Sequence, residues 1–151
     1  MLDNFKQKWF NEIENSRSLC TYKFLKNTFE FENYLDMLPK KLRICMSRLR
    51  LSSHRLKIET GRYAQNRIER NLRYCTLCNS NDIEDEFHFV IICPCYLNLR
   101  NNLIKSYYYK RPSMAKFIEL MQSKKYGVVL NLCKYIQEAF NVRNTLTNQT
   151  T

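Results

Sequence analysis

The sequence predicts a mainly α-helical fold, a small multi-helix domain with a short knuckle or β-hairpin inserted mid-chain. Only two Gly and three Pro occur among the 151 residues, so the chain carries few of the turn signals that a multi-stranded protein needs. Apolar residues recur at helical spacing over most of the chain. Hydrophobic residues make up 44% of the composition, which is enough to form a core.

Residues 1–38 are predicted to form an amino-terminal helical segment. Two short helical stretches, at residues 16–29 and 32–38, end before Pro39. A longer helix over residues 2–15 precedes them. It is predicted from apolar side chains at helical spacing, namely Leu2, Phe5, Trp9, Phe10 and Ile13.

Residues 39–110 are predicted to hold a basic helix, a basic loop and a cysteine-rich module. Pro39 suits the first position of the helix. Residues 52–70 lose helical periodicity and include Gly61, one of the two glycines, so we expect an extended basic loop there. The helix has one basic side, and its other side is an apolar stripe of Leu42, Cys45, Met46 and Leu49.

The carboxyl-terminal part begins at Pro94, which is placed to open a helix over residues 95–108. Residues 111–143 are predicted to form carboxyl-terminal helices that pack on the same core, with Ser113 as an N-cap. Residues 144–151 are polar and aperiodic, which predicts a disordered tail.

Positive charge is concentrated in one part of the chain. The protein has 25 Lys and Arg against 14 Asp and Glu, a formal net charge of +11. Residues 40–73 contain eleven Lys or Arg and two Glu, so +9 of that charge lies there. Arg offers a planar fork of donors to phosphate oxygens, and the segment therefore predicts nucleic-acid binding. The candidate residues are Arg43, Arg48, Arg50, His54, Arg55, Arg62, Arg67 and Arg70.

The same charge pattern has a second interpretation, a solvated helix face followed by a basic loop. His54 also has two interpretations: contact with a phosphate or base, or a hydrogen bond that holds the loop, which we favour. Arg55 and Arg62 are the better candidates for phosphate contact. Tyr63 and Tyr74 are candidates to stack on unpaired bases.

A cysteine and histidine cluster is the most specific motif in the chain. Cys75, Cys78, His88 and Cys93 follow a Cys-x2-Cys-x9-His-x4-Cys pattern. A Cys-x-x-Cys turn lets two thiolates converge on one ion, and four protein ligands leave no open position for water. The pattern therefore predicts one structural zinc ion, Zn2+, in a site without a catalytic role.

This ligand set has alternatives. Cys95 could replace Cys93 as the fourth ligand, and the four residues could also be two turn cysteines beside a core histidine and a core cysteine. A redox Cys-x-x-Cys pair fits less well, because no βαβ pattern surrounds it. Seven cysteines, an odd number, without an export signal argue against a disulfide framework.

Four short motifs together resemble a known family. They are LRLSSHRLKIETGRY at residues 49–63, the Cys-x-x-Cys pair, EDEFHF at 84–89 and CPCY at 93–96. With them the chain resembles the zinc-binding region at the carboxyl end of LINE-type (non-LTR) retrotransposon reverse transcriptases, most specifically over residues 40–100. The resemblance implies a role in binding template RNA or target DNA during target-primed reverse transcription.

The resemblance also implies roles for single residues. It places the zinc ligands of the family on Cys75, Cys78, His88 and Cys93. The conserved stretch of the family, Arg/Ser-Ser-His/Glu-x-Gly-Arg, falls on Arg50, Ser52, Ser53, His54, Glu59, Gly61 and Arg62.

The chain departs from the polymerase itself. It contains no Tyr-x-Asp-Asp and no two adjacent Asp, so the two-metal carboxylate site that a polymerase needs is missing from the sequence. Clusters of His with Asp typical of an endonuclease are missing as well. We therefore expect no enzymatic activity.

The sequence also bears on location. Its longest apolar run, residues 89–93, is too short for a membrane-spanning helix, and its charged, amphipathic start is unlike a secretory signal. We expect an intracellular protein, nuclear or cytoplasmic, with no membrane partner and no small-molecule substrate.

Together these patterns predict a non-catalytic domain that binds zinc and nucleic acid, either RNA or DNA, with a reverse-transcriptase polypeptide as a further candidate partner. The rival interpretation is a protein-interaction module whose basic surface docks an acidic partner such as the polymerase body. A third interpretation is a decayed retroelement fragment with no selected activity.

Overall fold

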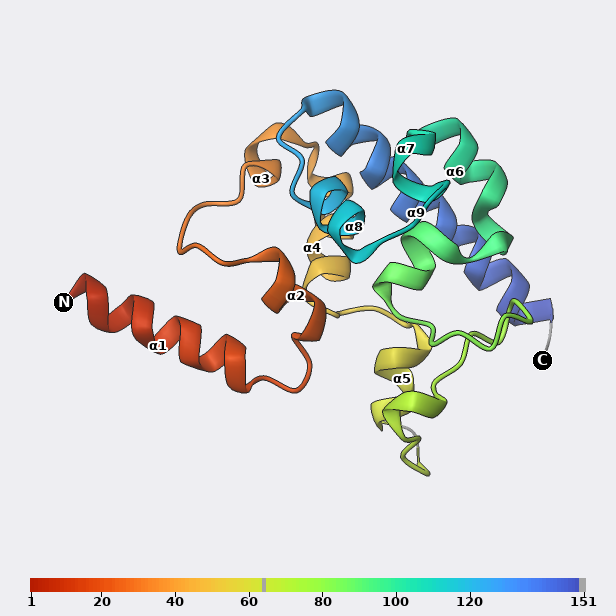
Figure 1. The fold of residues 1–151 in the computed structure, drawn as a ribbon, viewed down its shortest axis with the longest axis horizontal. Helices are drawn as coiled ribbons and strands as arrows, with labels where there is room; N and C mark the ends of the chain where they lie inside the picture. The colour runs from red at the N-terminus through yellow and green to blue at the C-terminus, as the bar shows by residue number, and fades with distance from the viewer. Residues whose placement is uncertain (64, 150–151) are drawn as a thin grey trace.

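The computed structural model describes residues 1–63 and 65–149 of the protein and shows a domain built from helices (Figure 1). Within these residues no β-strand forms, and a single antiparallel bridge pairs Tyr74 with Ile83. The prediction of a mainly α fold is confirmed, whereas the expected short hairpin is reduced to this bridge. The elements in chain order are α1 (Leu2–Asn15), α2 (Cys20–Leu25), α3 (Tyr34–Met37), α4 (Lys40–Arg50), α5 (Lys57–Tyr63), η1 (Arg70–Leu72), η2 (His88–Ile92), η3 (Pro94–Tyr96), α6 (Leu97–Leu103), α7 (Ser106–Tyr109), α8 (Met114–Met121) and α9 (Tyr126–Gln149).

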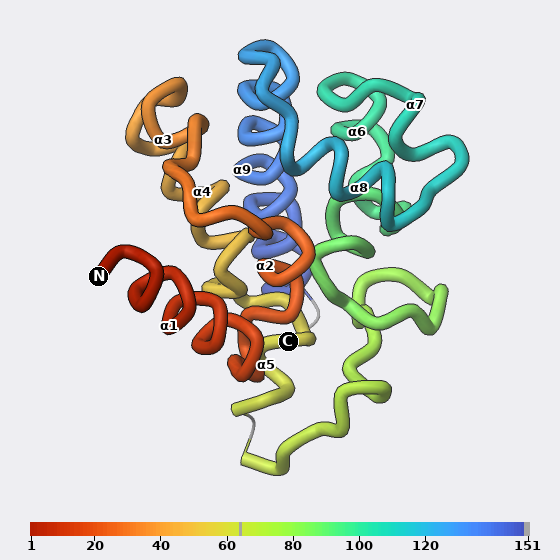
Figure 2. Tube along the Cα trace, turned by 60° about the vertical axis from the view of Figure 1, so that its left-hand side comes forward, coloured from red at the N-terminus to blue at the C-terminus, as the bar shows by residue number. Residues whose placement is uncertain are grey.

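Helix α9 is the central element of the fold. It packs against α4 and α6, and Figure 2 shows it running through the middle of the molecule between them. Leu132, Tyr135 and Ile136 of α9 are fully buried. From α4, Met46 and Leu49 enter the same core, as their apolar stripe predicts. The core therefore forms around one long helix.

Helix α1 lies to one side of this core (Figure 1). Its bounds match the helix predicted over residues 2–15. Ile13 is the one buried residue of α1, while Trp9 packs edge-on against Phe29 with ring centroids 5.3 Å apart. Phe5 remains exposed. Since helices in proteins are stabilised mainly by burying an apolar face, α1 is less firmly anchored than α4 or α9.

A helix interrupts the predicted basic loop. Helix α5 lies within residues 52–70, so the prediction of an extended loop over that range is wrong. The amide of Lys57 donates a hydrogen bond of 2.6 Å to the side chain of Glu84, and the amide of Ile58 donates one of 3.0 Å to the Glu84 carbonyl. These bonds give two backbone amides at the start of α5 a hydrogen-bond partner. Because the partner Glu84 lies 27 residues after Lys57, the local periodicity of the sequence could not reveal this helix start.

Helix α9 also extends past its predicted end. It continues to Gln149, so the prediction of a disordered tail is wrong for residues 144–149, and residues 150–151 lie outside the described residues. The hydroxyl of Thr145 donates to the Asn141 carbonyl at 3.1 Å, and the hydroxyl of Thr147 donates to the Arg143 carbonyl at 2.9 Å. Polar side chains bonded to the preceding turn are compatible with a helix, although they carry no apolar period.

The remaining helix predictions hold in outline. Helices α2 and α3 fall within the two short stretches predicted before Pro39. Pro94 opens the 3-10 turn η3, which continues as α6, and α7 is a separate helix. Ser113 caps α8, because its hydroxyl accepts a hydrogen bond of 3.3 Å from the amide of Lys116. In the described part of the chain, no helix is both long and apolar enough to cross a membrane.

Candidate metal centre and basic surface

The four predicted metal ligands come together from short, irregular elements. Cys75 follows the bridged residue Tyr74, and Cys78 lies in the turn after it. His88 is the first residue of the π-helical turn η2, and Cys93 directly follows the last. Cys93 also precedes η3. The cluster therefore joins the bridged turn to two consecutive helical segments.

The donor atoms of the cluster lie close enough together to coordinate one ion. The donor atoms of Cys75, Cys78, His88 and Cys93 lie within 4.8 Å of one another, and all four residues are buried. The Cys78 sulfur lies 3.4 Å from Nε2 of His88. Two tetrahedral ligands at about 2.3 Å for sulfur and about 2.0 Å for nitrogen lie about 3.5 Å apart. The four donors can therefore hold one metal ion.

Backbone bonds hold the turn that carries the first two cysteines. The amide of Cys75 donates to the carbonyl of Asp82 at 2.9 Å, and the amide of Glu84 donates to the carbonyl of Arg73 at 2.9 Å. Asn81 adopts a φ of 57°, in the left-handed region that Asn visits more readily than most residues. The turn is thus closed at its base by backbone hydrogen bonds.

The π-helical turn places the other two ligands. The amide of Cys93 donates to the carbonyl of His88 at 2.8 Å, five residues back. In an α-helix, residues five apart are rotated by about 140° around the axis, and the wider turn reduces this separation. Buried Arg100 donates through Nη2 to the Cys93 carbonyl and through Nε to the Val90 carbonyl, both at 2.9 Å. Arg100 therefore satisfies the end of the turn.

The buried thiols of Cys75 and Cys93 shift each other's pKa in opposite directions. The hydrogen bond with Cys93 is the largest influence on Cys75 and lowers its pKa, burial opposes this, and a bond with His88 lowers the pKa further. The same bond with Cys75, together with burial, raises the pKa of Cys93. A metal cation bound at the centre would favour the thiolate form of all three cysteines.

The second nitrogen of His88 faces a carboxylate. Within the described residues Nδ1 of His88 has no hydrogen-bond partner, and it lies 3.7 Å from Oδ2 of Asp82. A histidine that binds a metal usually turns its other nitrogen towards a carboxylate, a carbonyl or water, which fixes the ring and its tautomer. Asp82 is therefore placed to orient His88.

Cys95 lies beside the cluster and outside it. Its sulfur donates a hydrogen bond of 3.3 Å to the carbonyl of Leu77, in the turn between Cys75 and Cys78. The group of donors within mutual reach contains Cys93. Of the two alternatives for the fourth ligand, the structure favours Cys93.

The acidic residues after the turn have roles that sequence reasoning missed. Glu84 and Arg143 form two parallel bonds, Nε to Oε1 at 2.8 Å and Nη2 to Oε2 at 2.9 Å, and both residues are buried. Glu86 accepts hydrogen bonds from the hydroxyls of Ser52 at 2.9 Å and Thr21 at 2.7 Å. These partners come from distant parts of the chain, and no local motif marks them.

His54 belongs to this buried network. Its Nε2 lies 2.8 Å from Oε1 of Glu86, its side chain is 2% exposed, and its Nδ1 accepts a bond of 3.3 Å from the amide of Leu56. The interpretation of His54 as a residue that holds the loop is confirmed, and its assignment to nucleic acid is wrong. Burial raises the pKa of Glu86, but the hydrogen bond and charge of His54, together with the hydrogen bond from Thr21, leave that pKa lower than usual.

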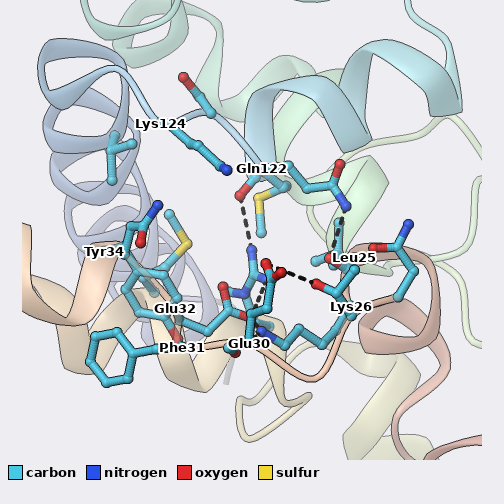
Figure 3. Close-up of a pocket in the computed structure, with 16 residues that line it drawn as sticks. Leu25, Lys26, Glu30, Phe31, Glu32, Tyr34, Gln122 and Lys124 are labelled. Atoms are coloured by element: carbon cyan, nitrogen blue, oxygen red, sulfur yellow. Dashed lines mark hydrogen bonds and ion pairs between the residues drawn. The ribbon is translucent and has the colours of Figure 1, made fainter. Parts of the chain in front are cut away.

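Arg50 is a second predicted nucleic-acid ligand that the structure buries. It is 2% exposed, donates to the Met121 carbonyl at 2.9 Å and to Glu32 at 3.0 Å, and lies over the ring of Tyr34 at 5.4 Å. Figure 3 shows Glu32, Tyr34 and Lys26 around the pocket of about 380 Å³ that Arg50 also lines. Arg50 joins α4 to α8, so its assignment to nucleic acid is wrong.

The other predicted nucleic-acid ligands divide into two groups. Arg43 and Arg62 are half-buried and already bonded, Arg43 to the Leu35 carbonyl at 2.8 Å and Arg62 to Glu59 at 2.9 Å. The exposed group is Arg48, Arg55, Arg67 and Arg70.

The cluster is compatible with an ion held within the fold. All four donors come from the chain and are buried, which is the arrangement of a structural metal site, since a catalytic site keeps one position open. Comparisons of the chain with protein families, with curated proteins and with solved structures find no match.

Proposed function

We propose that the protein is a non-catalytic nucleic-acid-binding domain whose fold is completed by one structural zinc ion. The observation that carries the proposal is the buried group of Cys75, Cys78, His88 and Cys93, with donor atoms within 4.8 Å of one another. Three soft sulfurs and one imidazole in a closed set are ligands typical of structural zinc. In this proposal Cys75 and Cys78 form a zinc knuckle.

The ion, when bound, supplies folding free energy, because its ligands converge only in the folded chain. The residues around it have defined roles. Asp82 orients His88, and Arg100 holds the carbonyl of Cys93. Glu84 and Arg143 tie the knuckle to α9. The proposed centre thus connects the middle of the chain to the central helix.

Charge supports nucleic acid as the partner. Residues 40–73 carry +9 of the formal charge of +11, and Arg48, Arg55, Arg67 and Arg70 of this segment are exposed. Exposed Arg side chains can neutralise phosphates and release their counterions. The resemblance to the zinc-binding region of non-LTR retrotransposon reverse transcriptases supports the same assignment. We extend the proposal to that origin, with RNA or target DNA as the ligand class.

The metal part is tested by elemental analysis of the purified protein and by circular dichroism during titration with a strong chelator. We expect one zinc per chain and a loss of helical signal as the metal is removed. A protein that folds without metal, and whose helical signal ignores the chelator, would contradict the structural role.

The nucleic-acid part is tested by competition. A labelled RNA oligonucleotide is bound to the zinc-loaded protein and displaced either with unlabelled RNA or with an acidic polypeptide of equal charge. We expect RNA to compete far better, with a steep dependence on salt concentration. Equal competition by the acidic polypeptide would contradict nucleic acid as the specific partner and favour a protein-interaction module.

A further inference from the structure

A basic groove lies between the amino-terminal helices and the segment around α5. Its volume is about 760 Å³. The wall on the α5 side comes from Arg62, Tyr63, Arg67, Arg70 and Arg73. The opposite wall comes from within residues 14–23, which carry no concentration of charge in the sequence. The cations that line this groove are Arg17, Lys23, Arg62, Arg67, Arg70 and Arg73.

A side-chain contact links the two walls, and further bonds hold the α5 side in place. Nη1 of Arg70 lies 3.1 Å from the sulfur of Cys20, which links the α5 side to α2. On the α5 side Arg73 is buried and donates to the Ile58 carbonyl at 2.7 Å and to the Ile68 carbonyl at 3.0 Å. Gly61 makes room for it, since a Cβ there would lie 2.9 Å from Cγ of Arg73.

The groove holds more positive charge than its own residues balance. Glu14 is the one acidic residue among the described residues that line it, against six cations. The pKa of Arg73 is lowered, first by burial and then by the neighbouring charges of Arg62 and Arg67. Like charges gathered in a concave site repel one another, and a polyanion in the groove would relieve that repulsion.

An aromatic ring stands in the same groove. Tyr63 lines it and is 76% exposed, at the end of α5. A large exposed ring beside Arg side chains is what single-strand binders use, because every base has a face that can stack on it. A base-paired duplex keeps its bases stacked inside and offers no free face.

We propose that this groove is the binding site for single-stranded nucleic acid, with the backbone between Arg17 on one wall and Arg67 and Arg70 on the other, and with Tyr63 stacked on an unpaired base. The inference rests on the proposed function and adds the site and the strandedness of the ligand. It also moves the interface away from α4, where the sequence places several of its candidates.

The test compares two triple variants of equal charge. The groove variant carries Arg17→Ala, Arg67→Ala and Arg70→Ala. The control carries Lys110→Ala, Arg111→Ala and Lys134→Ala, all exposed side chains outside the groove. Affinity for a short labelled single-stranded RNA is measured by fluorescence anisotropy over a range of salt concentrations. Circular dichroism and zinc content of each variant verify folding.

We expect the groove variant to bind at least about tenfold more weakly, with a slope of log affinity against log salt reduced by about 2, since each phosphate contact on a single strand contributes about 0.7. The control variant should retain most of the affinity. If the groove variant folds poorly, Arg67→Glu alone changes one exposed side chain and should still weaken binding.

A second pair of variants tests stacking. Tyr63→Ala should lower single-strand affinity about tenfold, whereas Tyr126→Ala, at a comparably exposed tyrosine on α9, should leave it unchanged. Removal of Tyr63 should leave the salt slope as it is, because no cation is lost.

The outcomes separate this inference from the function on which it rests. A protein that binds no oligonucleotide at all overturns both. Binding that survives in the groove variant and falls in the control overturns the groove and leaves the proposed function in place. Tighter binding of a hairpin duplex than of the single strand, or equal binding of poly-glutamate, overturns the single-stranded ligand.

Discussion

The metal centre and the basic groove use their reactive side chains in opposite ways. In the metal centre four donors face one another, and all are buried. In the groove Arg17, Arg67 and Arg70 are exposed, and the lining cations outnumber Glu14. The donors of the first region face one another inside the fold, whereas these three arginines of the second reach solvent. The difference teaches that burial, more than charge density along the sequence, separates side chains that hold the fold together from side chains that are free to contact a ligand.

The largest test of this comparison removes one metal ligand. Cys78→Ser should abolish stoichiometric metal binding and most of the helical signal, because metal binding in such sites provides about 10–16 kcal/mol, comparable with the whole stability of a domain. Cys95→Ser is the matched control, since Cys95 lies beside the cluster and bonds to the Leu77 carbonyl. Metal content and circular dichroism give the result. A folded, metal-loaded Cys78→Ser protein would contradict the structural site.

The next test sets two arginines of α4 against each other. Arg50→Ala should lower the free energy of unfolding by about 3 kcal/mol, because it removes a buried cation bonded to Glu32 and to the Met121 carbonyl. Arg48→Ala, two residues away and exposed, should change it by less than about 0.5 kcal/mol. Urea unfolding of the zinc-loaded proteins measures both. Equal effects of the two changes would break the distinction between inward and outward cations.

A third test uses pH. The pKa of Glu86 is lowered in the folded protein, so its charged form stabilises the fold near neutral pH, and this contribution is lost as pH falls through the folded pKa. Glu86→Gln should therefore cost about 1–3 kcal/mol at neutral pH, and the difference from wild type should shrink in acid. Both proteins lose ligands to protonation alike, so the difference in urea midpoint isolates Glu86. A stability difference between wild type and Glu86→Gln that grows in acid would contradict a lowered pKa of Glu86.

The smallest expected effect lies just outside the cluster. Asp82→Asn should weaken metal affinity about tenfold by loosening the orientation of His88, with little change in fold. Competition with a chromophoric chelator measures the affinity. Asp36→Asn, on the exposed side of α3, is the control and should have no effect. Identical affinities for the two variants would remove Asp82 from the metal centre.

The candidate metal ligands were predictable from the sequence because they lie close together in it, within residues 75–93. Two cysteines separated by two residues, followed by a histidine and a cysteine within the next fifteen positions, mark a cluster without knowledge of the fold. Helix α1 and the stripe of α4 were likewise predictable from apolar spacing. These are features that each element carries in its own residues.

The features that were missed depend on contacts between distant elements. Arg50 belongs to a basic run, and its burial is decided by the Met121 carbonyl 71 residues later. Helix α5 depends on Glu84, and His54 depends on Glu86. Two of the six cations that line the basic groove are Arg17 and Lys23, which lie outside the basic run of residues 40–73. Periodicity and composition do not indicate which distant residues will pair.

The π-helical turn between His88 and Cys93 has a consequence for how such a chain can vary. Its hydrogen bond spans five residues, and the residues at both ends are candidate metal ligands. Deleting one residue there would restore ordinary α-helical winding and swing one donor away from the ion. Residues 79–81, at the tip of the turn between Cys78 and Asp82, can in contrast change length with less effect on donor direction, since the base of the turn is closed by backbone bonds. Across diverging copies of this sequence, insertions and deletions should accumulate at this tip and spare the residues between His88 and Cys93.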